Sequence, residues 1–405
     1  MSKVPFAPPR MDEKIVNEVV DALYSGWITT GPRTKKFEEM LEQYTGAQNV
    51  VCLNSATAGM ELALRWFGVG PGDEVIVPVY TYCATGNVVL HCGAKVVFCD
   101  IQDDFNIDVK QLEGLITENT KVIMPVDIGG MPVDYVAINE MVRRPDIKAK
   151  FSGNTEIQKQ LGRILILADA AHSVGAKYQG KMSGVLADMS TFSFHAVKNL
   201  VTAEGGCVCL NLPEPFNNQD IYTALKRTSL HGQSKDALAK TKVGGWRYDI
   251  LEPGYKCNMT DLAAAIGLIE LERYDDDMLV RRKSIFDQYS SLLNQYSWAN
   301  IPVYQTDEKT SSYHIYMLRI NGISEEQRDL IMNEIAAQEV AVNVHFQPLP
   351  MLTAYKNLGY SIDNYPNGFK QYSCEITLPV FYDITSDQIQ LVVDTVSNAY
   401  DKVMG

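Results

Sequence analysis

Lys198 stands directly after an apolar segment that is typical of a buried strand. Lysine is seldom buried without a partner or a task. A lysine whose pKa is lowered by burial or by neighbouring groups can form a Schiff base with a carbonyl compound. A lysine that extends from a loop to solvent would give the same local sequence. Lys198 is therefore a candidate for covalent chemistry only together with other groups.

Two further segments could provide such groups. Asp169 ends the apolar run 164–169, and ligands of α/β sheets bind at the carboxyl ends of parallel strands. Capping of the next helix would explain Asp169 equally well. Residues 54–59, NSATAG, lie between a strand and a helix, where the N–H groups of small residues can enclose an anion. An ordinary N-cap at Ser55 or Thr57 is the alternative.

The three segments together point to one cofactor. Pyridoxal 5′-phosphate (PLP) needs an amine for its aldehyde, an acid opposite its pyridine nitrogen and an anion site for its phosphate. Lys198, Asp169 and the turn at Ala56 and Thr57 would provide all three within one sheet. The sequence therefore predicts a PLP site.

Short apolar runs that alternate with helical patterns predict the sheet that positions these groups. Near-continuous apolar character is typical of strands buried on both faces, and the alternation indicates an α/β fold with a mostly parallel sheet. The expected strands are 50–53, 74–80, 95–100, 121–126, 164–169, 189–194 and 206–210. A helix is expected over 57–67, ending at Gly68.

After residue 210 the pattern changes to a smaller α+β unit. We expect a helix over 259–293, a strand over 312–320, a helix over 325–339, a strand over 340–346 and a helix over 386–403. A domain boundary near residue 275 divides the chain into a large domain, 1–275, and a small C-terminal domain, 276–405. The polar segment 143–160 is interpreted as an insertion.

Composition excludes several classes of protein. The net charge of -13 disfavours a nucleic-acid partner. No apolar stretch is long enough to span a membrane, and the N-terminal residues lack the apolar core of a secretory signal, so we expect a cytoplasmic protein. The eight cysteines lack the spacing of a metal or disulfide framework, and no metal site is expected.

A series of short motifs runs along the chain: GWITTGP at 26–32, NSATA at 54–58, TYCAT at 81–85, DAAH at 169–172, SFHAVK at 193–198, EGG at 204–206, PGYKCNMT at 253–260 and VHF at 344–346. In this order and spacing, the motifs resemble the DegT/DnrJ/EryC1/StrS family of sugar aminotransferases. Within the family, GWITTGP, SFHAVKN and PGYKCN are most similar to the UDP-4-amino-4-deoxy-L-arabinose–oxoglutarate aminotransferase type.

The resemblance implies PLP-dependent transferase fold type I, in which a seven-stranded large domain carries a smaller α+β domain. It implies that Lys198 binds PLP covalently and moves a proton, and that Asp169 keeps the pyridine nitrogen protonated. Tyr82 is expected to stack on the ring, and His172 to lie near the ring hydroxyl. The expected phosphate contacts are Ala56, Thr57 and Ser193.

The resemblance also implies residues beyond the cofactor ring. Lys256 and Asn258 are expected from a partner subunit, so that a homodimer would share its active sites. His195 lies in a motif, but a satisfied polar role explains it as well. The candidate substrate contacts, for each of which a structural role is an equal alternative, are Thr30, His314, Tyr316 and His345.

Three positions bear on how far the resemblance extends. Ala56 stands where the family usually has glycine, but its N–H group remains available to a phosphate. Asp127, in the PVDIGG loop 125–130, stands where many members have histidine, which leaves the contacts of that loop open. Lys198 itself is retained, whereas relatives that dehydrate sugars replace it with histidine.

The expected reaction moves an amino group from L-glutamate to a nucleotide-linked keto sugar, at C4 of a UDP-4-keto-6-deoxyhexose, for capsule, lipopolysaccharide or glycan synthesis. One alternative is PLP-dependent sugar dehydration. Another is a non-catalytic regulator with the same fold, against which the Lys198–Asp169 pair argues.

Overall fold

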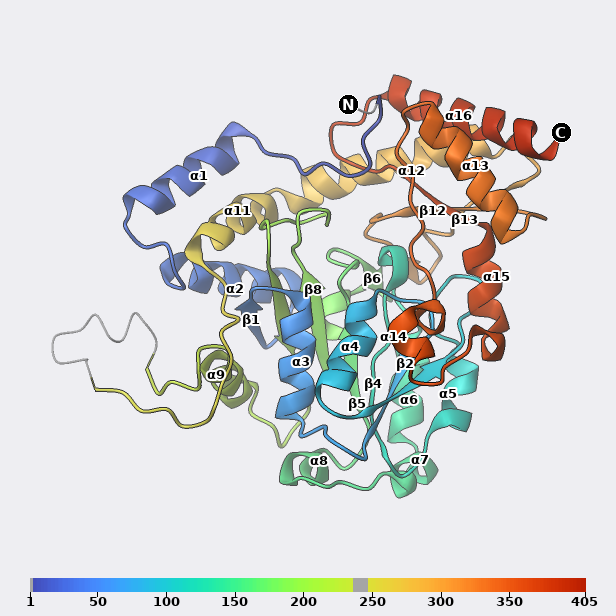
Figure 1. Cartoon of the computed structure of the whole chain (residues 1–405). Coiled ribbons are helices and arrows are strands. Elements are labelled where there is room, and N and C mark those ends of the chain that lie inside the picture. The colour runs from blue at the N-terminus through green and yellow to red at the C-terminus, as the bar shows by residue number, and fades with distance from the viewer. Residues whose placement is uncertain (1–2, 236–246) are drawn as a thin grey trace.

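The computed structural model describes residues 3–235 and 247–405 (Figure 1). Its central sheet has the strand order β1-β9-β8-β5-β4-β2-β3, and every neighbouring pair is parallel except the two that β9 makes. These strands are β1 (Asn49–Leu53), β2 (Glu74–Pro78), β3 (Lys95–Cys99), β4 (Thr120–Ile123), β5 (Leu165–Asp169), β8 (Met189–Ser193) and β9 (Gly206–Leu210). The predicted mostly parallel, seven-stranded sheet is confirmed.

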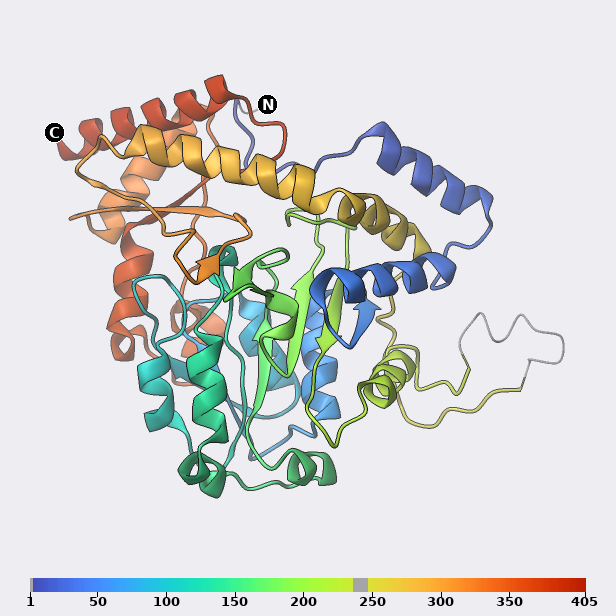
Figure 2. The ribbon, with the colours of Figure 1, turned by 180° about the vertical axis from the view of Figure 1, so that it is seen from behind.

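Helices cover both faces of this sheet (Figures 1 and 2). On one face, α3 (Ala56–Trp66) and α4 (Cys83–His91) share a core with Leu165 and Leu167 of β5. On the other face, α5 (Val109–Leu115) and α6 (Tyr135–Arg143) share a core with Ile166 and Ala168. Adjacent residues of one strand thus enter opposite cores, which is why the strand sequences are apolar throughout.

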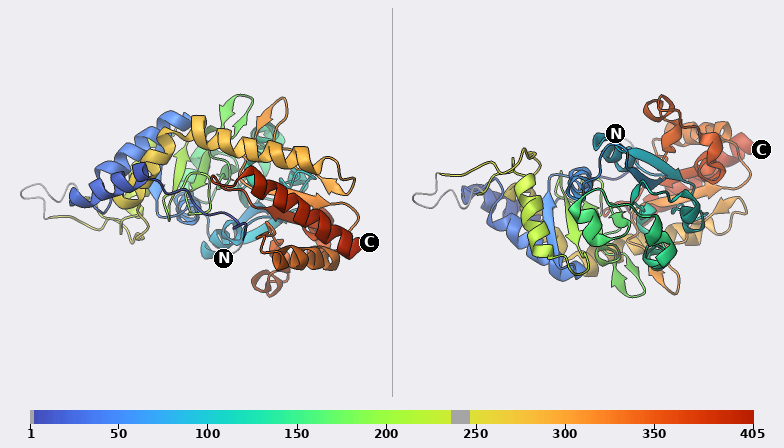
Figure 3. Two further views of the ribbon diagram at one scale, coloured as in Figure 1. Left: turned by 90° about the horizontal axis from the view of Figure 1, so that it is seen from above. Right: turned by 90° about the horizontal axis from the view of Figure 1, so that it is seen from below.

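The C-terminal part has its own core. An antiparallel sheet of β10 (Ala299–Asn300), β12 (Tyr316–Ile320) and β13 (Glu375–Leu378) packs with α12 (Val280–Leu293), α13 (Glu325–Ala337) and α16 (Ser386–Met404). Figure 3 shows α16 lying between α12 and α13. The boundary near residue 275 stays a prediction.

The remaining elements complete the chain. The longer helices are α1 (Glu13–Tyr24), α2 (Pro32–Thr45), α9 (Asn218–Thr228), α11 (Asp261–Glu272) and α15 (Pro366–Cys374). Short helices and turns are α7 (Pro145–Lys150), α8 (Glu156–Leu161), α14 (Thr353–Lys356), Ile128–Gly130, Ser183–Val185, Leu349–Met351 and Ile362–Asn364. A small sheet joins β6 (Lys177–Tyr178) to β7 (Lys181–Met182) and β11 (Lys309–Thr310).

Two expectations for the C-terminal part are wrong. Residues 340–346 form no strand, because only single bridges occur there, from Val340 to Val4 and from Asn343 to Thr377. The strand that lies beside these residues is β13, and its four residues are too few to show a strand pattern in the sequence. The expected helix 259–293 is divided into α11 and α12 by a π-helical turn at Tyr274–Leu279.

Within the two described ranges, no helix combines the length and the apolar character that crossing a bilayer requires. The segment 143–160, interpreted as an insertion, contains the short helix α7 and all but the last residue of α8.

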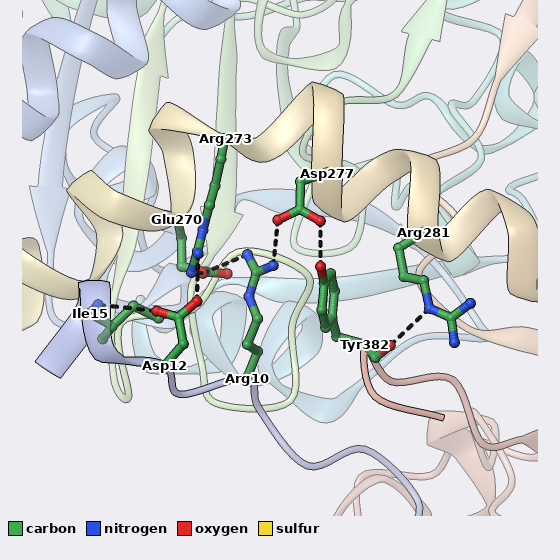
Figure 4. A network of polar contacts seen from close by, with 8 residues as sticks. All are labelled: Arg10, Asp12, Ile15, Glu270, Arg273, Asp277, Arg281 and Tyr382. Atoms are coloured by element: carbon green, nitrogen blue, oxygen red, sulfur yellow. Dashed lines mark hydrogen bonds and ion pairs between the residues drawn. The ribbon is translucent and has the colours of Figure 1, made fainter. Parts of the chain in front are cut away.

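The N-terminal segment is tied to both halves of the chain. Val4 exchanges backbone hydrogen bonds with Glu339 and Ala341. Arg10 is only 7% exposed, and its guanidinium binds Glu270 of α11 at 2.9 Å and Asp277 of the π-helical turn at 2.6 Å (Figure 4). The same guanidinium lies 4.1 Å above the centre of the Tyr382 ring.

Replacement of Arg10 with alanine is expected to destabilise the fold by about 1.5–3 kcal/mol, because hydrogen bonds to charged groups are lost in a buried setting. In the variant, Glu270 would still be paired with Arg273, 2.7 Å away, which limits the loss of stability. Urea unfolding measures the effect. Lys3→Ala is the control, since Lys3 is 57% exposed and 3.9 Å from Glu339, and should cost less than about 1 kcal/mol. Equal unfolding midpoints for the two variants would contradict the role of Arg10.

Candidate active site

A cavity of about 470 Å³ lies where the carboxyl ends of β5 and β8 meet the N-terminus of α3. Most of the predicted site residues line it. They are Ala56, Thr57, Tyr82, Asp169, His172, Ser193, Lys198, His314 and His345. Segments that are far apart in the sequence also reach this cavity, the N-terminal segment through Phe6 and β13 through Leu378.

Asp169 is a buried acid held in a fixed orientation. One carboxylate oxygen accepts a hydrogen bond from the Thr85 hydroxyl at 2.7 Å, and the other accepts one from the Ala171 N–H at 3.2 Å. Thr85 is itself paired with Thr81 at 2.8 Å. Burial raises the pKa of Asp169, and these two hydrogen bonds together with the Lys198 charge oppose that rise.

Lys198 lies in the cavity wall, four residues after the buried Phe194. Burial lowers the pKa of Lys198 to about 8, although the charge of Asp169 acts in the opposite direction. An amine with this pKa is neutral in a substantial fraction of molecules near pH 8, and the neutral amine is the nucleophile. The geometry therefore suits covalent capture of an aldehyde.

The N-terminus of α3 forms an anion cradle. Ser55 caps the helix by accepting a hydrogen bond from the Ala58 N–H at 3.1 Å. The Ala56 and Thr57 N–H groups belong to the first turn and have no intrahelical acceptor. The helix dipole adds a favourable field for a phosphate at this end. The predictions of a cap and of an anion site at this turn are thus compatible.

Gly206 allows β9 to approach this cradle. A Cβ atom at position 206 would lie 2.3 Å from the Ala56 nitrogen, which is closer than a Cβ atom approaches other atoms in folded proteins. Gly206→Ala should therefore displace the cradle, weaken PLP binding by about tenfold or more, and cost about 1–3 kcal/mol of stability. Fluorescence titration with PLP and thermal unfolding measure both effects. Gly70→Ala is the matched control, since a Cβ there meets nothing within 4 Å; equal PLP affinity in both variants would refute the cradle.

Aromatic rings frame the cavity beside Lys198. Tyr82 is 59% exposed, and its ring centre lies 5.7 Å from that of Phe346. The His172 ring also stacks on Phe346, with ring centres 5.8 Å apart. Burial and the Lys198 charge lower the pKa of His172 well below its usual value, so this histidine is neutral. Its Nδ1 is buried and has no hydrogen-bond partner among the described residues.

Two more histidines reach the cavity from the C-terminal part of the chain. The His314 ring lies 4.4 Å from that of His172, and its Nδ1 pairs with the Asn199 side chain at 2.8 Å. His345 Nδ1 pairs with Thr377 at 3.0 Å. Burial lowers the pKa of His345 to about 4, with the Lys198 charge acting in the same direction. Burial also lowers the pKa of His314 well below its usual value, so both rings are uncharged near neutral pH.

Several predicted residues lie outside this cavity. Lys256 donates to Asn258, and Asn258 donates to Thr30 at 2.5 Å, so these three side chains form a separate polar chain. The structure contradicts a substrate contact for Tyr316. Its side chain is fully buried in the C-terminal core and pairs with Ser290 at 2.9 Å, because the strand places this residue on the core-facing side.

Two residues that the motifs left open can now be placed. Asp127 is fully buried outside the cavity, where it accepts hydrogen bonds from Val133 N–H, the Tyr135 hydroxyl and the Ser173 hydroxyl at 3.0, 2.9 and 2.6 Å. It fastens the 127–135 loop. His195 borders the cavity but is exposed, 3.7 Å from Glu204.

Sequence reasoning missed other residues of the site. Phe6 stacks on His345 with ring centres 5.5 Å apart, although it lies far away in the sequence. Thr85 belongs to the TYCAT motif, but the motif alone does not identify it as the partner of Asp169. No sequence signal points to Phe6, whereas the TYCAT motif contains Thr85.

The donor set fits PLP. An amine of lowered pKa, a buried acid at the end of a strand, and free helix N-terminal amides line the same cavity. The unpartnered Nδ1 of His172 is a polar atom that a ligand hydroxyl could satisfy. Gly206 packs closely against the Ala56 amide, and because it has no side chain it does not displace the cradle.

The model of the DegT/DnrJ/EryC1/StrS aminotransferase family matches residues 9–397. The chain belongs to this family. Relatives in the family align along almost their whole length. A UDP-4-amino-4-deoxy-L-arabinose–oxoglutarate aminotransferase of Shewanella sediminis is 33% identical over an alignment of 413 positions that covers 97% of this chain and 97% of the relative. The spore coat polysaccharide biosynthesis protein SpsC of Bacillus subtilis is 32% identical over 400 residues, 97% of this chain and 96% of SpsC.

A solved structure is similar as well. Spr1654 of Streptococcus pneumoniae, assigned as a sugar aminotransferase, superposes in its PMP form with a TM-score of 0.95 at 46% identity, covering 99% of this chain and 100% of that chain. Its PLP form superposes with a TM-score of 0.94. The predictions of the family, of fold type I and of PLP as cofactor are confirmed, and the protein is a PLP-dependent aminotransferase.

Proposed function

We propose that this aminotransferase moves an amino group from L-glutamate to a keto sugar carried by a nucleotide, with PLP bound covalently at Lys198. The observation that carries the proposal is the convergence of the Lys198 amine, the Asp169 carboxylate and the α3 amides in one cavity. The names of the Shewanella and Bacillus relatives support a sugar acceptor.

PLP, when bound, supplies an electron-withdrawing ring that can store an amino group between two half-reactions. The Asp169 carboxylate would hold a proton on the ring nitrogen, while Thr85 fixes the position of that carboxylate. Lys198 Nζ would take a proton from the α-carbon of the amino donor and would then donate it to the cofactor carbon. A pKa of about 8 suits both directions of this transfer. The Ala56 and Thr57 amides with Ser193 would hold the phosphate.

For the acceptor, we propose C4 of a UDP-4-keto-6-deoxyhexose, whose aminated product serves capsule, lipopolysaccharide or other glycan synthesis. Similarity to the Shewanella enzyme supports the UDP carrier. His314 and His345 are the proposed substrate contacts in the cavity, where their neutral rings can exchange hydrogen bonds with sugar hydroxyls. The eight cysteines are free thiols, as suits a reducing compartment such as the cytoplasm.

We further propose that two copies form a homodimer with shared active sites. The α1 helix and the residues near it expose a group of apolar side chains that suits an interface. They are Met11, Val16, Val20, Leu23, Tyr24 and Ile28. The polar chain of Thr30, Asn258 and Lys256 lies outside its own cavity, so a partner's cavity is the proposed place of action.

Subunit mixing tests the shared site. Lys198→Ala and Lys256→Ala should each be impaired alone, but their mixture should regain activity, since a mixed dimer contains one site with both lysines intact. Mixing Lys198→Ala with Lys198→Arg is the control and should regain nothing. Equal activity of the two mixtures would contradict a shared site.

The acceptor is tested with ¹⁵N-labelled L-glutamate and a panel of UDP-, dTDP- and GDP-linked 4-keto sugars. Mass spectrometry should find ¹⁵N in a UDP-linked amino sugar. A labelled sugar with another carrier would overturn only the choice of UDP. A sugar that loses water without gaining ¹⁵N would favour the dehydratase alternative and refute the transfer.

A further inference from the structure

A buried carboxyl group is connected to the cavity through two side chains. Glu375 and Thr377 lie on the same side of β13, and backbone hydrogen bonds between Asn343 and Thr377 hold the segment of His345 beside that strand. The Thr377 hydroxyl lies 2.5 Å from Glu375 Oε1 and 3.0 Å from His345 Nδ1. The other oxygen, Oε2, accepts the His345 backbone N–H at 3.1 Å. His345 in turn lines the cavity.

The hydroxyl of Thr377 has one proton, so it can donate a hydrogen bond either to Glu375 or to His345, but not to both. When Glu375 is ionised, the hydroxyl donates to the carboxylate, so it can only accept from His345 Nδ1–H. His345 Nε2 then carries a lone pair. When Glu375 carries a proton on Oε1, the carboxyl donates to Thr377, and Thr377 donates to a bare His345 Nδ1. His345 Nε2 then carries the hydrogen.

Both states are accessible near neutral pH. Glu375 is fully buried, and no cation binds its carboxylate directly among the described residues. Burial raises its pKa to about 8; its two hydrogen bonds and the charges of Arg328 and Arg319 limit the rise. The group that it controls, His345, faces the charge of Lys198 and stays neutral. The stacked ring of Phe6 holds the imidazole in place.

We infer that Glu375 is a positioning residue which, through Thr377, determines whether His345 presents a lone pair or a hydrogen at Nε2 to the substrate. A lone pair accepts a hydrogen bond from a sugar hydroxyl, whereas an N–H group donates to a carbonyl or carboxylate oxygen. The inference deepens the proposed function, since it rests on a sugar or an amino acid meeting His345 in the cavity.

The ring nitrogens of ¹⁵N-histidine-labelled, PLP-loaded enzyme report the tautomer directly. The sequence has six histidines, and a His345→Gln spectrum identifies the signals of His345. Between pH 6 and pH 9 the wild type should change from the Nε2–H form to the Nδ1–H form, with a midpoint near the pKa of Glu375, about 8. Glu375→Gln should keep the Nε2–H form throughout, because its carbonyl oxygen is needed to accept the His345 backbone N–H, which leaves its NH2 group to donate to Thr377.

Variants of Thr377 separate the relay from simple packing. Thr377→Ser keeps the hydroxyl and should titrate like the wild type, whereas Thr377→Val keeps the volume and should abolish the change of tautomer. Thr377→Val should also raise KM for the keto sugar by about tenfold, the effect of one lost hydrogen bond. These variants remain informative even if Glu375→Gln does not fold.

A tautomer of His345 that stays constant in the wild type, or that titrates equally in Thr377→Val, would overturn the inference. The measurement needs no substrate. It therefore fails or succeeds separately from the amino transfer of the proposed function, which the labelled-glutamate assay tests.

Discussion

Replacement of Lys198 with alanine is expected to reduce amino transfer from L-glutamate by at least about 10³-fold. The variant loses the nucleophile that captures the cofactor, together with the base that moves the proton. Lys198 is the one lysine in the cavity lining among the described residues. Rates of 2-oxoglutarate release, measured with saturating PLP, give the effect.

Lys181→Ala is the control for removal of a lysine, since Lys181 lies exposed on β7, away from the cavity. Its rate should equal that of the wild type. Lys198→Ala should still fold and retain PLP weakly through the α3 cradle. A Lys198→Ala variant that keeps more than a tenth of the wild-type rate would refute the assigned role.

Asp169→Asn is expected to lower the rate of the same half-reaction by about 10²-fold or more. Asparagine fills the same space and can still accept from Thr85, but its neutral amide cannot stabilise a proton on the ring nitrogen. The loss of preorganised charge in a buried site has effects of this size. Stopped-flow absorbance after addition of L-glutamate measures the rate.

Asp127→Asn is the matched control, because Asp127 is another fully buried acid, directly after the residue Val126 that pairs with Asp169, but does not line the cavity. That substitution should lower stability through its three hydrogen bonds and leave the rate within about threefold. Comparable rate losses in the two variants would indicate that Asp169 acts only through folding.

The sequence was sufficient to predict the large sheet, because its strands are buried on both faces and appear as unbroken apolar runs. It was also sufficient to bring Lys198, Asp169 and Thr57 together, since strand ends and the adjoining turn of a parallel sheet share one edge. The short β13 gave no such signal: polar Glu375 and Thr377 alternate with apolar residues in a strand of only four residues.

Contacts between distant segments could not be predicted. Tyr316 and His314 are two residues apart, yet the first lies in the C-terminal core and the second in the cavity. Phe6 reaches His345 only because Arg10 and Val4 fix the N-terminal segment against both halves of the chain. Periodicity describes one element at a time and carries no information on such packing.

The absorbance spectrum of the PLP-loaded enzyme before and after addition of L-glutamate tests the central claim most directly. The visible band of lysine-bound PLP should fall, and the near-ultraviolet band of the aminated cofactor should rise in its place. A visible band that L-glutamate leaves unchanged would contradict the proposed donor. The absence of that band after loading with PLP would contradict the assignment of Lys198.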